Sequence, residues 1–441
     1  MLRGAAAICE VGPVTAPDLA LVAALVFAWA TVSARLERSD VTAPIVFTAA
    51  GLVLTHGPLT PLGITPSPQT VRGLAETTLV LVLFCDASRV HLPALRADWT
   101  LYARLLGIGL PLTIGLGTLA AVALLPHPDI WIALLVGAAL APTDAALGAG
   151  MILNPLVPAR IRRLINVESG LNDGIATPFV TIALAGAATA EHATSVTPLE
   201  AVAELIIGVA AGAAVGGAGG WLLRLTRRRG WAAAEFAGPG VLALAACAYA
   251  CALALHGNGF IAAFVGGLAF DAMAGEPGER LVPFVEDVGG LVSLLVWLAF
   301  GAVVVASAFS GLTWQTVLYA GLSLTVVRML PVAVALAGSG LGRAAALFIG
   351  WFGPRGLASV VFGMLALEDL GPAAARPAVS AIGVTVVASV VLHGATADPL
   401  ARRYGPGLTP AAPLAGDAAG GGPEMPVRRL TRKPAPGQRT A

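Results

Sequence analysis

The sequence predicts an all-α membrane protein that crosses the bilayer many times. Of its 441 residues, 57% are hydrophobic and only 12% are charged, about half of the roughly 25% found in soluble domains. Apolar stretches recur from Leu19 to Leu400 and leave no polar block large enough for a soluble domain. The formal charge is only +1, yet the arginines are unevenly placed along the chain. A water-soluble enzyme is thereby excluded.

A helix that crosses a membrane needs about 20 predominantly apolar residues. Thirteen windows approach this condition, at residues 17–34, 41–56, 71–88, 100–125, 130–151, 164–188, 200–223, 235–255, 257–273, 287–306, 314–337, 344–367 and 378–397. We therefore predict about thirteen transmembrane helices. Windows one to six and eight to thirteen would form two inverted six-helix repeats around a linker helix, an arrangement common in transporters.

The arginines predict the orientation, because basic residues accumulate in cytoplasmic loops. If the N-terminus is outside, sixteen arginines lie in or next to the cytoplasmic loops, whereas the outer segments carry only Arg3, Arg72 and Arg376. Five further basic residues follow Tyr404. We expect a multi-pass protein of the cell (plasma) membrane with its C-terminus in the cytoplasm.

Composition also predicts the domain organisation. The transmembrane domain is expected to span residues 17–403, after an N-terminal segment at residues 1–16. Residues 404–441 are mainly Pro, Gly, Ala and Arg, so we expect a disordered, basic cytoplasmic tail. We expect no nucleotide-binding domain and no nucleic-acid partner.

Two windows contain helix interruptions. The fifth carries Ala-Pro-Thr-Asp at residues 141–144, and the twelfth carries Gly-Pro-Arg-Gly at residues 353–356. Proline removes a backbone donor and clashes with the preceding turn, so the backbone around Thr143 is expected to open and to present carbonyl oxygens to a cavity. Interrupted helices at corresponding positions of two repeats indicate a transporter's binding site.

The sixth window carries an oxygen-rich face. Ser169, Asn172 and Asp173 are three and four residues apart and share one side of a helix. Hard cations prefer such oxygen ligands, and a buried carboxylate can hold either a cation or a proton. Charged groups at membrane depth are costly and indicate function; the deep set consists of Asp86, Asp144, Glu168, Asp173, Arg328 and Arg355.

The segment Glu168-Ser169-Gly170-Leu171-Asn172-Asp173-Gly174 resembles the E-S-x-x-N-D-G motif of the Na+/H+ exchanger branch of the monovalent cation:proton antiporters. Thr143-Asp144 is similar to the family's T-D pair, and Arg355-Gly356 to its R-G segment. Weaker similarities occur at residues 328–331 and 392–400, and the resemblance covers about residues 17 to 403.

The resemblance implies the Na+/H+ antiporter fold, with crossed discontinuous helices, in a homodimer whose core domain moves against a dimerisation domain. It implies that Asp173 is the carboxylate that binds cation and proton, with Asp144, Thr143 and Ser169 as further cation ligands. Asn172 occupies the place of a second aspartate in the electrogenic branch. It therefore implies electroneutral exchange of one proton per cation, and in the family it helps to fix the neighbouring acids.

The resemblance also assigns the other deep charges. Glu168 would pair with Arg355 and hold the sixth helix to the broken twelfth. Asp86 corresponds to an acid of the family's third helix, although an ordinary helix-end role stays open. For Arg328, helix-end or interdomain pairing is favoured over a role in ion binding.

The predicted function is secondary exchange of protons for monovalent cations in pH homeostasis, with Na+ as the expected cation and K+ and Li+ as the alternatives. The substrates are the cation and H+, the environment is the lipid bilayer, and we expect no cofactor. A cation channel or facilitator and an organic-solute carrier on a related inverted-repeat fold are the alternatives. An intramembrane enzyme that used Ser169 is disfavoured, because no serine lies in a nucleophile-elbow context.

Overall fold

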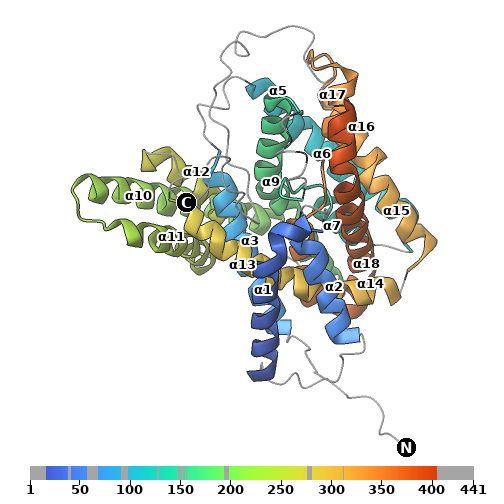
Figure 1. Ribbon diagram of the computed structural model, residues 1–441, viewed down its shortest axis with the longest axis horizontal. Helices are drawn as coiled ribbons and strands as arrows, with labels where there is room; N and C mark the ends of the chain where they lie inside the picture. Colours follow the sequence, from blue (N-terminus) through green and yellow to red (C-terminus); the bar gives the residue numbers. More distant parts are fainter. Residues whose placement is uncertain are drawn as a thin grey trace, which may run out of the picture.

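The computed structural model describes residues 16–37, 41–56, 68–90, 98–126, 129–147, 151, 154, 156–192, 198–275, 281–310 and 312–404 (Figure 1). The described residues form helices and their connections, without a strand among them. The predicted N-terminal segment and basic tail lie outside the described residues, apart from Ala16 and Tyr404, which belong to helices.

Helices occupy every one of the predicted windows. The first half contains α1 (Ala16–Glu37), α2 (Ala43–His56), α3 (Pro68–Ser88), α5 (Trp99–Arg104), η2 (Leu105–Gly109), α6 (Leu110–Leu124), α7 (Ile130–Ala139) and α9 (Ala159–His192). The second half contains α10 (Pro198–Arg228), α11 (Ala234–Ala254), α12 (Gly259–Ala274), α13 (Pro283–Ala299), η4 (Phe300–Val305), α14 (Ala306–Ser310), α15 (Trp314–Leu324), α16 (Val326–Ala335), α17 (Gly342–Trp351) and α18 (Leu357–Tyr404). Among the described residues, eight helical segments are long and apolar enough to cross a membrane, and α2, α7 and α12 are shorter apolar helices.

Several predicted spans consist of two consecutive helices. The backbone of Thr325 leaves the helical region (φ −113°, ψ −92°) and separates α15 from α16. The long α18 bends at Gly371, whose positive φ of 74° favours glycine. The part of α18 before Gly371 completes the twelfth predicted window, and the part after it contains the thirteenth.

The helices pack into two bundles. The α3 bundle contains α2, α3, α10, α11, α12, α13 and η4; the α18 bundle contains α5, η2, α6, α7, α9, α15, α16, α17 and α18. Figure 1 shows α10 to α12 on one side of the molecule, α15 to α18 on the other, and α3 and α9 between them. The two bundles meet where α3 packs against α9 and α18, where α12 packs against α9, and where η4 and α13 pack against α18.

Small residues bring α10 and α12 into close contact within one chain. A Cβ atom at Gly212 would lie 2.5 Å from the carbonyl oxygen of Ala262, and one at Gly216 would lie 2.1 Å from that of Gly266. Backbones approach this closely only where side chains are absent, as is common between membrane helices. The glycines of α10 therefore serve packing inside the α3 bundle.

Candidate cation-binding site

The two predicted interruptions lie against each other at the centre of the α18 bundle. Helix α7 ends at Ala139 and helix α17 at Trp351, and non-helical backbone follows each of them. The backbone N–H of Asp144 donates to the carbonyl oxygen of Pro354 over 2.8 Å. The prediction of crossed, discontinuous helices is confirmed, and the crossing itself is a hydrogen-bonded structure.

The Asp144 carboxylate stabilises this crossing. One oxygen accepts the N–H of Ala146 at 2.9 Å, and the other accepts the N–H of Leu357, the first residue of α18, at 3.2 Å. A carboxylate at a helix N-terminus interacts favourably with the helix dipole. Because an ionised carboxylate has about four lone-pair sites, Asp144 retains oxygen lone pairs for a cation.

The Asp144 side chain lies so close to the backbone of residue 356 that only glycine fits there. A Cβ atom at residue 356 would lie 2.1 Å from the Cβ of Asp144 and 2.4 Å from Oδ2. We expect Gly356→Ala to lower the stability of the protein by about 1–3 kcal/mol, as overpacking does, and to remove most transport, because Asp144 must move. Gly321→Ala in α15 is the matched control, since nothing lies within 4 Å of its added Cβ. Thermal unfolding and transport by both purified variants test this; equal behaviour would contradict it.

A buried polar cluster joins the α7 interruption to α9. The hydroxyl groups of Thr143 and Ser169 lie 2.9 Å apart. The Asn172 side-chain amide donates to Thr143 Oγ1 at 2.8 Å, and its oxygen accepts the Thr143 N–H at 3.3 Å. Asn172 is fully buried and contacts Thr143 from outside the cavity lining. Asn172 therefore holds Thr143 in place beside Ser169.

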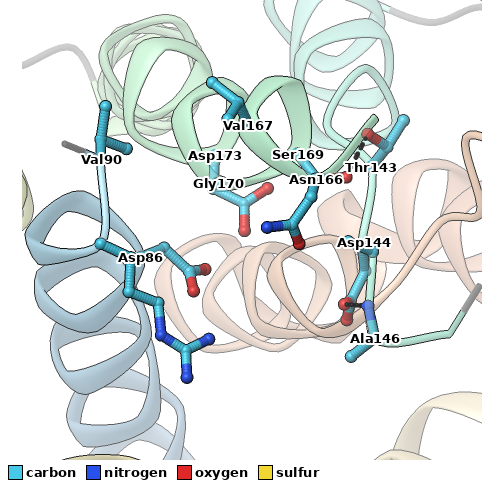
Figure 2. Close-up of a pocket in the computed structure, with 12 residues that line it drawn as sticks. Asp86, Val90, Thr143, Asp144, Ala146, Asn166, Val167, Ser169, Gly170 and Asp173 are labelled. Atoms are coloured by element: carbon cyan, nitrogen blue, oxygen red, sulfur yellow. Dashed lines mark hydrogen bonds between the residues drawn. The ribbon is translucent and has the colours of Figure 1, made fainter. Parts of the chain in front are cut away.

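A small cavity of about 40 Å³ lies beside this cluster (Figure 2). The carboxyl groups of Asp86 from α3, Asp144 from the interruption and Asp173 from α9 border it, together with the side chains of Thr143 and Ser169. The complete lining is Asp86, Arg89, Val90, Thr143, Asp144, Ala145, Ala146, Asn166, Val167, Ser169, Gly170 and Asp173. A volume of this size accommodates a monovalent cation with one or two waters.

Asp173 occupies the centre of this arrangement. Its side chain is 6% exposed, and Figure 2 shows it directed into the space between Asp86 and the interrupted segment. The structure thus brings Asp173, Asp144, Thr143 and Ser169 to one cavity. It also places Asp86 there, on the α3 bundle, so that the cavity lies between the two bundles.

Sequence reasoning missed two lining residues, Asn166 and Arg89. Asn166 lies three residues before Ser169 and seven before Asp173, so helical spacing alone could have placed it on the same face. Arg89 forms an ion pair with Glu286 of α13, a partner almost 200 positions away. No local pattern could have identified that contact.

The predicted pairing of Glu168 with Arg355 is wrong. Glu168 pairs instead with Arg328 through two parallel bonds, Nη1 to Oε1 at 2.6 Å and Nη2 to Oε2 at 2.8 Å. Both residues are 1% exposed. The backbone change at Thr325 turns α16 so that Arg328 points inward, and Gly353 leaves room for it, because a Cβ there would lie 2.6 Å from Arg328 Nε. Arg328 therefore pairs from the first turn of α16, as the helix-end prediction expects, but its partner lies in the same bundle and not across the two bundles.

Arg355 binds backbone carbonyl groups of the first interruption and of α15. Its guanidinium donates to the carbonyl oxygens of Ala141 at 3.0 Å, Pro142 at 3.3 Å and Ser323 at 3.1 Å. Its backbone N–H donates to Ser389 Oγ at 2.7 Å. Arginine is suited to this position because its planar fork presents several donors at once. Arg355 thereby connects both interruptions to α15 and α18.

Crossed interrupted helices next to a small acidic cavity define a polytopic membrane transporter. The chain belongs to the sodium/hydrogen exchanger family: the family model described as "Sodium/hydrogen exchanger, transmembrane" matches residues 21–403. This match confirms the family that the E-S-x-x-N-D-G resemblance indicated.

Individual relatives agree with this family. The chain is 28% identical over 382 residues to the K(+)/H(+) antiporter NhaP of Alkalimonas amylolytica, in a match that covers 84% of this chain and 64% of that protein. The structure of the sodium proton antiporter MjNhaP1 from Methanocaldococcus jannaschii at pH 8 superposes with a TM-score of 0.73 at 19% identity, over 88% of this chain and 98% of that one. An electron-microscopy map of the same antiporter gives a TM-score of 0.65 at 20% identity, over 87% and 97%. These superpositions confirm the predicted antiporter fold.

Proposed function

We propose that this protein exchanges protons for monovalent cations across a membrane by competition at Asp173. The observation that carries the proposal is the cavity of about 40 Å³ into which Asp173, Asp144, Thr143 and Ser169 converge. Its oxygens suit a hard cation. The single buried carboxylate at the centre can bind either a proton or a cation. Exchange results if the protein opens to the other side of the membrane only when one of the two is bound.

The arrangement of the bundles supports alternating access. Asp173, Asp144, Thr143 and Ser169 belong to the α18 bundle, whereas Asp86 belongs to the α3 bundle across the cavity. Movement of one bundle against the other would transfer the cation between the two sides of the membrane. The gradients of the two ions supply the energy, so we propose that no ATP and no cofactor take part. Asp86 would contribute to the cation site in the state described here.

Na+ is the proposed cation, with K+ and Li+ to be compared. One relative is named as a K(+)/H(+) antiporter and the solved neighbour as a sodium proton antiporter, so the family accommodates more than one ion. Asn172 supplies an uncharged amide next to Asp173, which supports the exchange of one proton per cation without net charge movement. For a cell that favours proton entry, we propose cation export in pH homeostasis.

The alternative functions fit the site less well. An organic solute needs a pocket of about 300–1,000 Å³, several times the volume of the cavity at Asp173. A carrier of organic anions would want an arginine available in the site. Arg89 lines the cavity but pairs with Glu286, Arg328 pairs with Glu168, and Arg355 binds carbonyl groups. A channel would show conductance rather than saturable exchange. The exchanger family also supports a transporter over an intramembrane enzyme.

We further propose the remaining features that the resemblance implies. The protein would be a homodimer in the plasma membrane, with its N-terminus outside and its C-terminus in the cytoplasm. Large apolar side chains that the chain leaves exposed, such as Phe27, Ile206 and Phe236 at 71%, 63% and 71%, support contact with lipid or a second protomer, because water-exposed surfaces rarely carry them.

The proposed competition predicts how transport depends on pH. As pH falls, the apparent KM for the cation should rise, by up to about tenfold per pH unit for a single competing proton, while the maximal rate stays nearly constant. Proteoliposomes with an imposed pH gradient and added NaCl, KCl or LiCl provide the measurement. A maximal rate that falls with pH at constant KM would contradict competition at one carboxylate.

A parallel set with the membrane potential clamped by an ionophore tests electroneutrality. We expect the same rates with and without the clamp. Rates that follow the potential would show that more than one proton moves per cation. Current without saturation would favour the channel.

A further inference from the structure

A second, larger cavity lies at the opposite end of α3 from the cation site. Its volume is about 370 Å³, and residues of α3, α9, α12 and α18 surround it. Its lining is Arg72, Glu76, Val180, Thr181, Leu184, Ala185, Ala188, Phe260, Phe362, Leu365 and Asp369. Like the cation site, this cavity lies between the α3 bundle and the α18 bundle.

The second cavity approaches Asp173 from the other side. Arg72 and Asp86 are fourteen residues apart on α3, which corresponds to about 20 Å along a helix. On α9, the lining residue Val180 lies two turns beyond Asp173, about 10 Å along the helix. Val180 and Phe362 are each 1% exposed, so packed side chains separate this cavity from the cation site. The cavity therefore has the position of a closed access route.

An ion pair connects the two bundles at this cavity. Arg72 Nη1 of the α3 bundle lies 2.6 Å from Asp369 Oδ1 of the α18 bundle. Within α3, Arg72 Nε lies 2.7 Å from Glu76 Oε1, and the Tyr249 hydroxyl of α11 donates to Glu76 Oε2 at 3.1 Å. Arg72 and its partners thus join α3, α11 and the end of the first part of α18.

We propose that Arg72 and Asp369 form a latch that holds the two bundles together on this side and opens when the cation site becomes accessible from it. The proposal rests on the proposed exchange by alternating access. Arg72 and Asp369 then act on the equilibrium between the two access states, not on the cation itself.

The chemistry of the pair suits a contact that forms and breaks in each cycle. The side chains of Arg72 and Asp369 are 49% and 30% exposed, and exposed ion pairs are weak. Arg72 keeps Glu76 as a partner when Asp369 leaves, because those two residues share α3. Asp369 precedes the bend at Gly371, so the part of α18 before the bend can move while the part after it stays in place. Opening therefore leaves no buried charge behind.

Labelling of an introduced cysteine tests the latch independently of transport. Ala185 lines the cavity, and Ala185→Cys, with the four native cysteines replaced by alanine, reports access by a membrane-impermeant maleimide. We expect Arg72→Gln to raise the labelling rate by up to about fivefold, which is the effect of removing one exposed ion pair. The charge-swapped pair Arg72→Asp with Asp369→Arg should restore the low rate.

Arg402→Gln is the matched control, because it removes an exposed ion pair with Asp398 inside a single helix, at 3.1 Å. It should leave the labelling rate unchanged. Equal rates for Arg72→Gln and the unmutated background would overturn the latch, as would no restoration by the swapped pair. This readout needs no transport, so failure of the proposed exchange would not be mistaken for failure of the latch.

Cross-linking provides the transport readout. In the same cysteine-free background, Arg72→Cys with Asp369→Cys can be joined by a short, reducible thiol cross-linker. We expect exchange to stop after cross-linking and to return after reduction. Unchanged exchange in a fully cross-linked sample would overturn the latch, whereas absence of exchange before any cross-linking would count against the proposed function.

Discussion

Asp173→Asn is expected to abolish cation-dependent proton transport. Asparagine has nearly the same size and retains one oxygen, but it neither binds a proton near neutral pH nor carries the charge that compensates a bound cation. Because Asp173 lies at the centre of the cavity, both half-reactions should fail together. Proteoliposomes that contain the variant should lose a pH gradient no faster than protein-free vesicles after NaCl, KCl or LiCl is added.

The variant should fold normally, which separates this prediction from a structural effect. A buried carboxylate is costly to desolvate, so the neutral amide should leave the thermal unfolding temperature equal or raise it. Asp271→Asn is the matched control: Asp271 is also buried, at 8% exposure, but it belongs to α12 and lies outside the cavity lining. We expect Asp271→Asn to retain exchange. Residual cation-dependent exchange by Asp173→Asn would exclude Asp173 as the shared carboxylate.

Much of the fold could be predicted because membrane helices leave strong local signals. Each span needs a long apolar window, and the described helices occupy all of those windows. Pro142 and Pro354 marked the two interruptions, because proline removes a backbone donor wherever it occurs. The crossing follows once the two interrupted segments meet, since each provides donors and acceptors that the other needs. Local chemistry was sufficient for these features.

Contacts between distant helices could not be predicted in the same way. The partner of Glu168 depends on the rotation of α16, and that rotation follows from the backbone of Thr325, which no residue pattern indicates. Arg72 and Asp369 are almost 300 positions apart, and their contact depends on how the two bundles pack. A buried arginine requires a partner, but the sequence contains two deep arginines, Arg328 and Arg355, and does not indicate which of them pairs with Glu168.

Loss of the Glu168–Arg328 ion pair is expected to lower the stability of the protein strongly. Both side chains are 1% exposed and share two short bonds. Glu168→Gln would leave Arg328 buried and charged without its counter-ion, which costs about 3–5 kcal/mol. We expect a marked fall in the unfolding temperature in detergent and a low yield of folded protein. The double variant Glu168→Leu with Arg328→Met should recover most of that stability, because a hydrophobic pair avoids the desolvation of both charges.

A double-mutant cycle discriminates this pair from the pair that the sequence favoured. The effects of Glu168→Gln and Arg328→Gln should be strongly non-additive, since the two residues share two hydrogen bonds, whereas the coupling between Glu168→Gln and Arg355→Gln should be much smaller. Arg355, in the second interruption, donates to the Ala141 carbonyl of the first interruption and to the Ser323 carbonyl of α15, so its loss should impair transport through the geometry of the crossing. Coupling of Glu168 to Arg355 rather than to Arg328 would instead require a different rotation of α16, and with it a different crossing at the cation site.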